Sequence, residues 1–192
     1  MNNYPHSPRF IEIPNNKFWA RVTRCGSASI EWAIKNLYHP EITITDPLDK
    51  TIPLWRWQMP KIPTPTGDIY IVVRDPIKRF ISACYLYQIN DIDNAINSLT
   101  SGEFNIFVNI SIAQEFRIQS DWILPNLTYH YYDFDNNGPQ NLANDLGLGT
   151  LLTLNKSNPQ NPLILTDNQI GLLQSYYAKD IALYNSIKSS NN

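Results

Sequence analysis

The chain has 192 residues, of which 43% are hydrophobic and 17% charged, the balance of a folded globular protein rather than a disordered one. This length suits one domain with a single buried core over residues 1–192, and the net charge of −2 argues against a general nucleic-acid binder. No stretch approaches the roughly 18 apolar residues of a membrane span, and residues 1–14 lack the basic and apolar regions of a signal peptide. We therefore expect a cytoplasmic protein with neither nucleic acid nor membrane as a partner.

Strand-like and helix-like patterns alternate in the first part of the chain. Residues 1–16 are expected to form an extended arm. Residues 18–23 (FWARVT) are prone to form a strand, and the polar segment 24–29 separates them from residues 30–37, where apolar side chains recur at helical spacing. This order predicts a strand, a tight loop and a helix. Residues 42–45 form a second run rich in β-branched side chains.

The middle of the chain contains the clearest strand pattern. After a Pro- and Trp-rich segment at 46–66, which we expect to be irregular, residues 69–73 (IYIVV) form the continuous apolar run of a strand buried on both faces of a parallel sheet. Pro76 is well placed at the first position of a following helix. The apolar face of that helix carries Ile77, Phe80, Ile81, Cys84 and Tyr85. Cys25 and Cys84 are too few for a disulfide framework, so we expect free thiols.

The last part of the chain continues the alternation. Residues 91–121 look mostly helical, 127–132 are a fourth strand candidate and 142–146 a short helix. Thr166 has the hydroxyl to cap a final helix that runs to about Ile187. Strands that alternate with helices imply an α/β fold of three layers, in which helices flank a central parallel sheet on both faces.

The loop after the first strand has the groups of an anion site: Arg24, Cys25, Gly26, Ser27, Ala28 and Ser29. Backbone N–H groups, two hydroxyls and one cation lie there at a helix N-terminus, where amides and the helix dipole attract an anion. Gly26 lets the backbone approach a ligand closely. An ordinary helix cap is the alternative interpretation. The loop lacks the Gly-Lys-Ser/Thr ending of nucleotide triphosphatases, which argues against an ATPase or kinase.

A second candidate segment follows the buried strand, at residues 74–82 (RDPIKRFIS). Arg74 leaves the end of a strand, where open α/β sheets bind their ligands. Ser82 lies about two helical turns further on and shares a face with the first turn. Together they could hold a phosphate, Arg74 through paired charge-assisted hydrogen bonds from its guanidinium and Ser82 through its hydroxyl. Alternatively, Arg74 pairs with Asp75 or with a carbonyl at the sheet edge.

Both segments resemble motifs of the sulfotransferase family. Residues 21–30 (RVTRCGSASI) resemble its 5′-phosphosulfate loop, commonly R-V-P-K-T/C-G-S-T-S. Residues 72–83 (VVRDPIKRFISA) resemble its 3′-phosphate motif, R-D-P-x-x-R-x-x-S, and agree at every named position. Weaker likenesses to the carbohydrate-type branch follow at 130–134, 142–148, 154–157 and 177–184. The matches run in the family's order from residue 21 to residue 184.

The resemblance implies a P-loop-like sulfotransferase fold and a donor, 3′-phosphoadenosine 5′-phosphosulfate (PAPS), which is used without a metal. The first loop would hold the 5′-phosphosulfate, and Arg74 and Ser82 the 3′-phosphate, which Lys156 would also reach. The family normally has lysine at the position of Arg24, where it stabilises charge on the bridging oxygen as the sulfuryl group leaves. Arginine keeps the charge but presents it as a planar fork. Ala28 replaces a residue with a hydroxyl.

Sulfuryl transfer to a hydroxyl also requires a general base. The displacement is roughly in line and depends on positioning and electrostatic stabilisation, and a carboxylate or imidazole must take the proton of the acceptor. In the family this base often lies between the two phosphate motifs. Asp46 is our first candidate, and Glu41, His39 and Asp49 remain open. Alternatively, Asp46 caps a turn before Pro47.

The acceptor and two rival functions stay open at this point. The resemblance favours a carbohydrate or another hydroxylated acceptor. Trp55, Trp57 and Tyr70 could stack on sugars, or could close a hydrophobic lid instead. One rival is a non-catalytic protein of the same fold that binds PAPS or its product, 3′-phosphoadenosine 5′-phosphate (PAP), with Arg24 and Ala28 as signs of lost activity. The other is a phosphoryl-transfer enzyme on a shared fold.

Overall fold

The computed structural model describes four stretches of the chain, residues 10–41, 65–101, 115–154 and 162–190. The chain forms two compact units. The sheet unit comprises Met1–Val73 and Asp121–Asn155, and the helical unit comprises Arg74–Ser120 and Lys156–Asn192.

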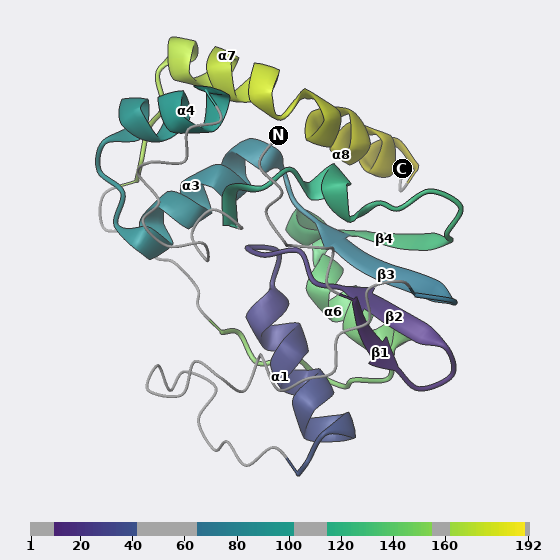
Figure 1. Ribbon diagram of the computed structural model, residues 1–192. Helices are drawn as coiled ribbons and strands as arrows, with labels where there is room; N and C mark the ends of the chain where they lie inside the picture. Colours follow the sequence, from purple (N-terminus) through teal and green to yellow (C-terminus); the bar gives the residue numbers. More distant parts are fainter. Residues whose placement is uncertain (1–9, 42–64, 102–114, 155–161, 191–192) are drawn as a thin grey trace. The chain divides into compact units, whose positions relative to one another are not determined.

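The described residues of the sheet unit form four strands in the order β1-β2-β3-β4 (Figure 1). They are β1 (Phe10–Ile13), β2 (Lys17–Ala20), β3 (Asp68–Val73) and β4 (Tyr129–Asp133). The first pair is antiparallel, and the β2–β3 and β3–β4 pairs are parallel. Asn15 and Asn16 make the turn between β1 and β2 with φ of 68° and 57°, which asparagine tolerates better than most residues.

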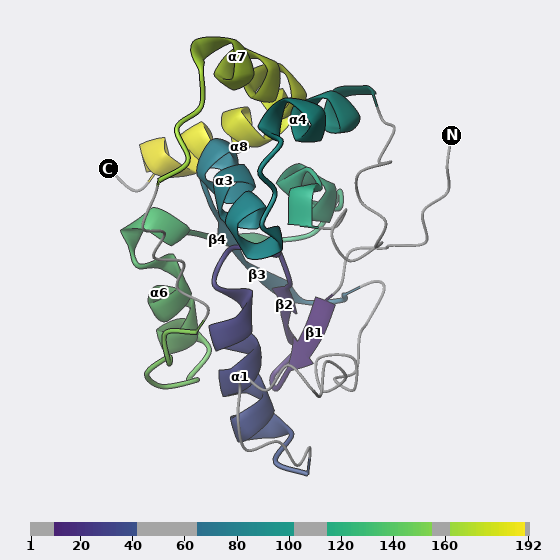
Figure 2. The same ribbon diagram turned by 90° about the vertical axis from the view of Figure 1, so that its left-hand side faces the viewer.

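Among its described residues, the sheet unit also has the α-helices α1 (Ser27–Tyr38) and α6 (Gly138–Asp145). Helix α6 packs against β3, β4 and α1 (Figure 2). A short 3-10 helix, η2 (Phe134–Asn136), connects β4 to α6. The continuous apolar run of β3 is buried along its whole length, from Ile69 to Val73, as expected for a strand inside a parallel sheet.

The helical unit contains α3 (Pro76–Tyr87), α4 (Ile92–Ser101), α7 (Asp167–Tyr176) and α8 (Ala178–Ser190). Helix α7 packs against α4, α3 and α8. The buried core of this unit consists of Phe80, Ala83, Cys84, Ile92, Ala95, Ile96, Leu99, Phe116, Leu173 and Tyr177. Of the five apolar side chains predicted on the helix after Pro76, Phe80 and Cys84 lie in this core, Ile77 and Ile81 pack against it partly buried, and Tyr85 belongs to neither group.

The last helix was predicted as one element and is two. Thr166 caps α7 as expected and forms a capping box with Gln169, but the helix ends at Tyr176 and α8 starts at Ala178. The residue between them, Tyr177, is fully buried, and its hydroxyl donates a hydrogen bond to the carbonyl of Phe116 at 2.7 Å. This tertiary contact holds Tyr177 in place between the two helices. No local sequence pattern predicts the break.

Other boundaries also differ from the prediction. The expected N-terminal arm includes β1, which the short run FIEI did not reveal because its signal depends on pairing with β2. In the region 91–121, which was expected to be mostly helical, α4 covers Ile92–Ser101 and a 3-10 helix, η1, covers Gln119–Trp122, while residues 102–114 lie outside the described stretches. Helix α6 starts at Gly138, ahead of the predicted residue 142.

Over the described stretches, the fold is α/β, with a four-stranded, mostly parallel sheet and six α-helices. None of the helices in these stretches is long and apolar enough to cross a membrane. Cys25 and Cys84 are both buried, and neither forms a disulfide among the described residues, as predicted. The predicted strand at 42–45 lies outside the described residues.

Candidate functional site

The two candidate segments start at the same edge of the sheet. Strand β2 ends at Ala20 and β3 at Val73, and the two strands are parallel neighbours with Ala20 paired to Ile71. The loop 21–26 continues directly from β2, and Arg74 is bonded to the last residue of β3. Both segments therefore begin at the carboxyl ends of adjacent parallel strands, the usual ligand-binding edge of such sheets.

The loop before α1 has an unusual backbone. Arg24 and Gly26 both have left-handed conformations, with φ of 63° and 76°. This conformation is uncommon for a residue other than glycine and costs of order 1–3 kcal/mol, and it is found preferentially at functional sites. Gly26 is the N-cap of α1, and no side chain caps the helix there. The first amides of the helix thus lie at its positive end without a capping side chain.

The loop is tightly packed against the segment after β4. A Cβ added at Gly26 would lie 2.8 Å from Cγ of Pro139 and 3.5 Å from Cε2 of Phe134. Cys25 and Ala28 are buried. The buried Ser29 hydroxyl accepts a hydrogen bond from the backbone N–H of Leu154 at 3.2 Å. Only a glycine fits at position 26, because the turn needs both its positive φ and its missing side chain.

Arg21 and Glu31 form an ion pair beside this loop. The Nε of Arg21 donates to Oε1 of Glu31, whose side chain is fully buried on α1. A buried carboxylate needs such a partner. Arg21, the first residue of the segment that resembles the phosphosulfate loop, therefore has a structural role in joining the loop to α1.

Within the second segment, three residues have clear structural roles. Asp75 caps α3, since its Oδ1 accepts hydrogen bonds from the N–H groups of Ile77 and Lys78 at 2.9 and 3.0 Å. Pro76 occupies the first helical turn, where its missing N–H costs nothing. Arg79 is fully buried and donates to the carbonyls of Glu115, at 2.9 Å, and of Arg117. The Asp-Pro part of the R-D-P-x-x-R pattern is therefore explained by the start of α3, and its second arginine by tertiary contacts with residues 115–117.

Arg74 and Ser82 are the other two residues of that pattern. The side chain of Arg74 is half-buried, and Ser82 is 4% exposed on α3. The backbone of Arg74 pairs with the side-chain amide of Gln119: its N–H donates to Oε1 at 3.0 Å and its carbonyl accepts from Nε2 at 2.8 Å. Asp180, on α8, accepts from the N–H of Gln119 at 2.6 Å. Sequence reasoning missed Gln119, which no motif contains.

The general-base candidates divide into two groups. His39 and Glu41 follow the C-terminal end of α1 and face each other, with Nδ1 and Oε1 3.3 Å apart. A helix of this length spans roughly 18 Å, so neither residue lies near the loop at the other end of α1. Asp46 and Asp49 lie outside the described residues, and so does the predicted phosphate ligand Lys156.

Of the three aromatic residues proposed for acceptor binding, the structure describes only Tyr70. Trp55 and Trp57 lie outside the described residues. Tyr70 is 7% exposed and stacks on His130 with ring centroids 4.7 Å apart. A ring covered in this way is part of the packing of the sheet and has no open face for a sugar.

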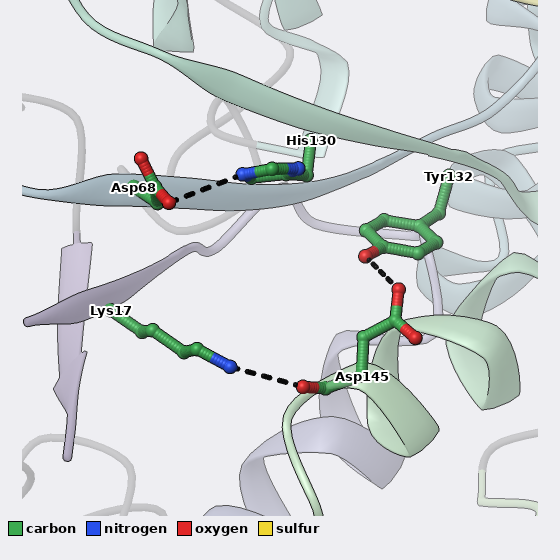
Figure 3. Close-up of polar contacts among 5 residues, drawn as sticks. All are labelled: Lys17, Asp68, His130, Tyr132 and Asp145. Atoms are coloured by element: carbon green, nitrogen blue, oxygen red, sulfur yellow. Dashed lines mark hydrogen bonds and ion pairs between the residues drawn. The ribbon is translucent and has the colours of Figure 1, made fainter. Parts of the chain in front are cut away.

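A polar cluster joins the sheet to the end of α6 (Figure 3). Lys17 donates to the carbonyl of Asp145 at 3.2 Å, and the Tyr132 hydroxyl donates to its carboxylate at 2.6 Å. Nε2 of His130 and Oδ2 of Asp68 lie 3.5 Å apart. Lys17 and Asp68 are the first residues of their strands, so this cluster reaches the edge opposite the two candidate segments. Lys17 and Tyr132 both bond to Asp145 and so join β2 and β4 to α6, and we interpret the cluster as structural.

No group of three or more histidine, cysteine, aspartate or glutamate side chains that could hold a metal ion occurs among the described residues. In chemical terms the candidate segments offer cations, backbone amides and hydroxyls, which suit an anionic ligand. Comparison with known proteins finds no match, since no family model, no curated protein and no solved structure matches the chain.

Proposed function

We propose that the protein is a sulfotransferase that moves a sulfuryl group from PAPS to a hydroxyl acceptor, of which a carbohydrate is our first choice. The observation that carries this proposal is the origin of the two motif-like segments at the carboxyl ends of adjacent parallel strands, β2 and β3. On this proposal the sheet is the centre of a three-layer, P-loop-like sulfotransferase fold.

The first loop supplies the groups for the 5′-phosphosulfate. The left-handed backbone at Arg24 and Gly26 and the N-terminus of α1, with no side-chain cap, support an anion-binding role. The guanidinium of Arg24 would balance the charge that develops on the bridging oxygen. Arg74 and Ser82 would bind the 3′-phosphate, with Lys156 as a further ligand. Asp75, Pro76 and Arg79 shape the segment without touching the ligand.

The reaction proceeds by displacement at sulfur. The acceptor oxygen attacks sulfur while the bond between sulfur and the bridging phosphate oxygen breaks, and PAP leaves. The proton of the acceptor hydroxyl passes to a general base, for which Asp46 is our first candidate and Asp49 the second. No metal takes part in this scheme.

Calorimetric titration with PAP tests donor binding. Arg74→Ala should weaken PAP binding about ten- to hundredfold, because it removes charge-assisted hydrogen bonds to a phosphate. Lys78→Ala, which removes an exposed cation four residues away on α3, is the matched control and should bind PAP normally. Normal PAP binding by Arg74→Ala, or tighter binding of ATP than of PAP by the unaltered protein, would refute the proposal.

Transfer of label from 35S-PAPS to a panel of glycans and small alcohols tests catalysis. A non-catalytic PAPS-binding protein is the second candidate, favoured by Arg24 in place of lysine and by the buried Ala28 in place of a hydroxyl. Tight PAP binding without any transfer would support that candidate. Arg24→Lys should then show whether the lysine of the family's loop restores turnover.

A further inference from the structure

The backbone of Arg74 is held by a side chain from a distant segment of the helical unit. Val73 and Asp133 are the last residue pair of the β3–β4 ladder, and the next residue, Arg74, pairs with the side-chain amide of Gln119 instead. A carboxamide offers one acceptor and a donor side by side, as a backbone peptide does. Gln119 therefore extends the hydrogen bonding of β3 by one residue beyond the strand.

Gln119 is itself fixed by Asp180. The Asp180 carboxylate is 1% exposed and accepts hydrogen bonds from two backbone N–H groups, of Gln119 at 2.6 Å and of Ser120 at 2.8 Å. Hydrogen bonds to an ionised acceptor are stronger than neutral ones. Asp180 thus joins the start of α8 to the start of η1 and sets the position from which the Gln119 side chain reaches Arg74.

The residues just before Gln119 also accept hydrogen bonds from distant side chains of the helical unit. Arg79 of α3 donates to the carbonyls of Glu115 and Arg117, and the Tyr177 hydroxyl donates to the carbonyl of Phe116. The segment 115–120 is therefore fastened from both α3 and α8. Near the end of this segment, Gln119 in turn bonds to the backbone of Arg74.

We propose that Gln119 and Asp180 are positioning residues, which orient Arg74 for binding of the 3′-phosphate of the nucleotide. This inference rests on the proposed function. The arginine side chain is long, and a phosphate contact made with a fixed backbone loses less conformational freedom than one made from a mobile residue. Gln119 and Asp180 act through Arg74, and neither touches the ligand.

The contribution of the 3′-phosphate is measured by calorimetry as the ratio of two dissociation constants, that of adenosine 5′-monophosphate to that of PAP. Gln119→Ala should reduce this ratio roughly tenfold, a change equivalent to about 1.4 kcal/mol, and should leave the affinity for the monophosphate unchanged. Asp180→Asn should reduce the ratio less, because one of its two acceptor oxygens remains. Gln119→Glu keeps the size of the side chain but loses the donor to the Arg74 carbonyl, so it should behave like Gln119→Ala.

Two comparisons separate positioning from a general loss of structure. Gln169→Ala removes a glutamine of the same unit that bonds to Thr166 and Asp93, and it should leave the ratio unchanged. In an Arg74→Ala background, Gln119→Ala should reduce PAP affinity no further, because the residue through which it acts is gone. Equal weakening of both ligands by Gln119→Glu, or an additive loss in the double variant, would overturn the inference.

The outcomes also separate this inference from the proposed function. If the unaltered protein binds PAP no better than the monophosphate, or if Arg74→Ala keeps the full ratio, the proposed function fails and the positioning role fails with it. If Arg74→Ala lowers the ratio and the Gln119 variants do not, the proposed function stands and the positioning role alone is refuted.

Discussion

The hydroxyl of Tyr132 donates a hydrogen bond to the carboxylate of Asp145 across 2.6 Å, which joins β4 to the last turn of α6. Helix α6 also begins beside the phosphosulfate-like loop, because Pro139 in its first turn lies against Gly26. The contact at its far end therefore helps to hold the helix that supports the loop.

Tyr132→Phe should lower the free energy of unfolding by about 1 kcal/mol, the usual net worth of one hydrogen bond, and should change its dependence on pH. Burial, and then the hydrogen bond to Asp145, raise the pKa of Tyr132 well above its ordinary value. The folded protein therefore keeps this proton above about pH 10, where the unfolded chain loses it, and stability must fall as the pH rises. Urea denaturation at about pH 9 and 11 should show a smaller fall for the variant. Equal falls would contradict this account.

Gly26→Ala should destabilise the protein more than Gly147→Ala. Both glycines have a positive φ, of 76° and 69°, so both substitutions carry the cost of about 1 kcal/mol for a side chain in that conformation. At Gly26 the new Cβ would also meet Pro139 at 2.8 Å, whereas nothing lies within 4 Å of it at Gly147. Thermal unfolding of the two variants measures the difference. Equal losses would mean that Pro139 moves aside without cost.

Asp75→Ala should destabilise the protein by about 1 kcal/mol, because the first amides of α3 lose the side-chain acceptor that caps them. Asp75→Asn keeps an oxygen at the same place and should retain most of the stability. Chemical denaturation of both variants checks the prediction. An equal loss in Asp75→Asn would show that the carboxylate charge, and not the cap, is what stabilises the helix.

Arg79→Met should cost about 2–4 kcal/mol, because two backbone carbonyls lose the donors that the buried guanidinium supplies. Arg79→Lys should recover only part of this loss, since a single ammonium cannot reproduce the planar fork. Lys179→Ala, at an exposed position of α8, is the control and should stay within about 0.5 kcal/mol. Full recovery in Arg79→Lys would show that charge matters here and the geometry of the donors does not.

Cys84 should resist alkylation in the folded protein. The thiol is 1% exposed, and burial raises its pKa to about 12, so almost no reactive thiolate exists at about pH 8. Iodoacetamide labelling followed by mass spectrometry should modify Cys84 only when denaturant unfolds the chain. Rapid labelling of Cys84 under native conditions would contradict its placement in the core of the helical unit.

Local signals in the sequence predicted much of the fold correctly. The apolar run at 69–73 is β3, Pro76 starts α3, and Thr166 caps α7. Each of these features depends on residues within a few positions of one another, because helix caps and strand burial are properties of short segments. The order of strand, loop and helix around Arg24 was also predictable for this reason.

The sequence by itself therefore determined β3, the starts of α3 and α7 and the two candidate segments, with their cations and hydroxyls. Only the tertiary structure decided what holds those segments. Gln119 reaches Arg74 across 45 positions, Asp180 reaches Gln119 across 61, and Tyr177, which lies between α7 and α8, bonds to Phe116, also 61 positions away. Side-chain amides and carboxylates can satisfy backbone groups anywhere in a fold, so no periodicity or spacing marks such partners before the chain has folded.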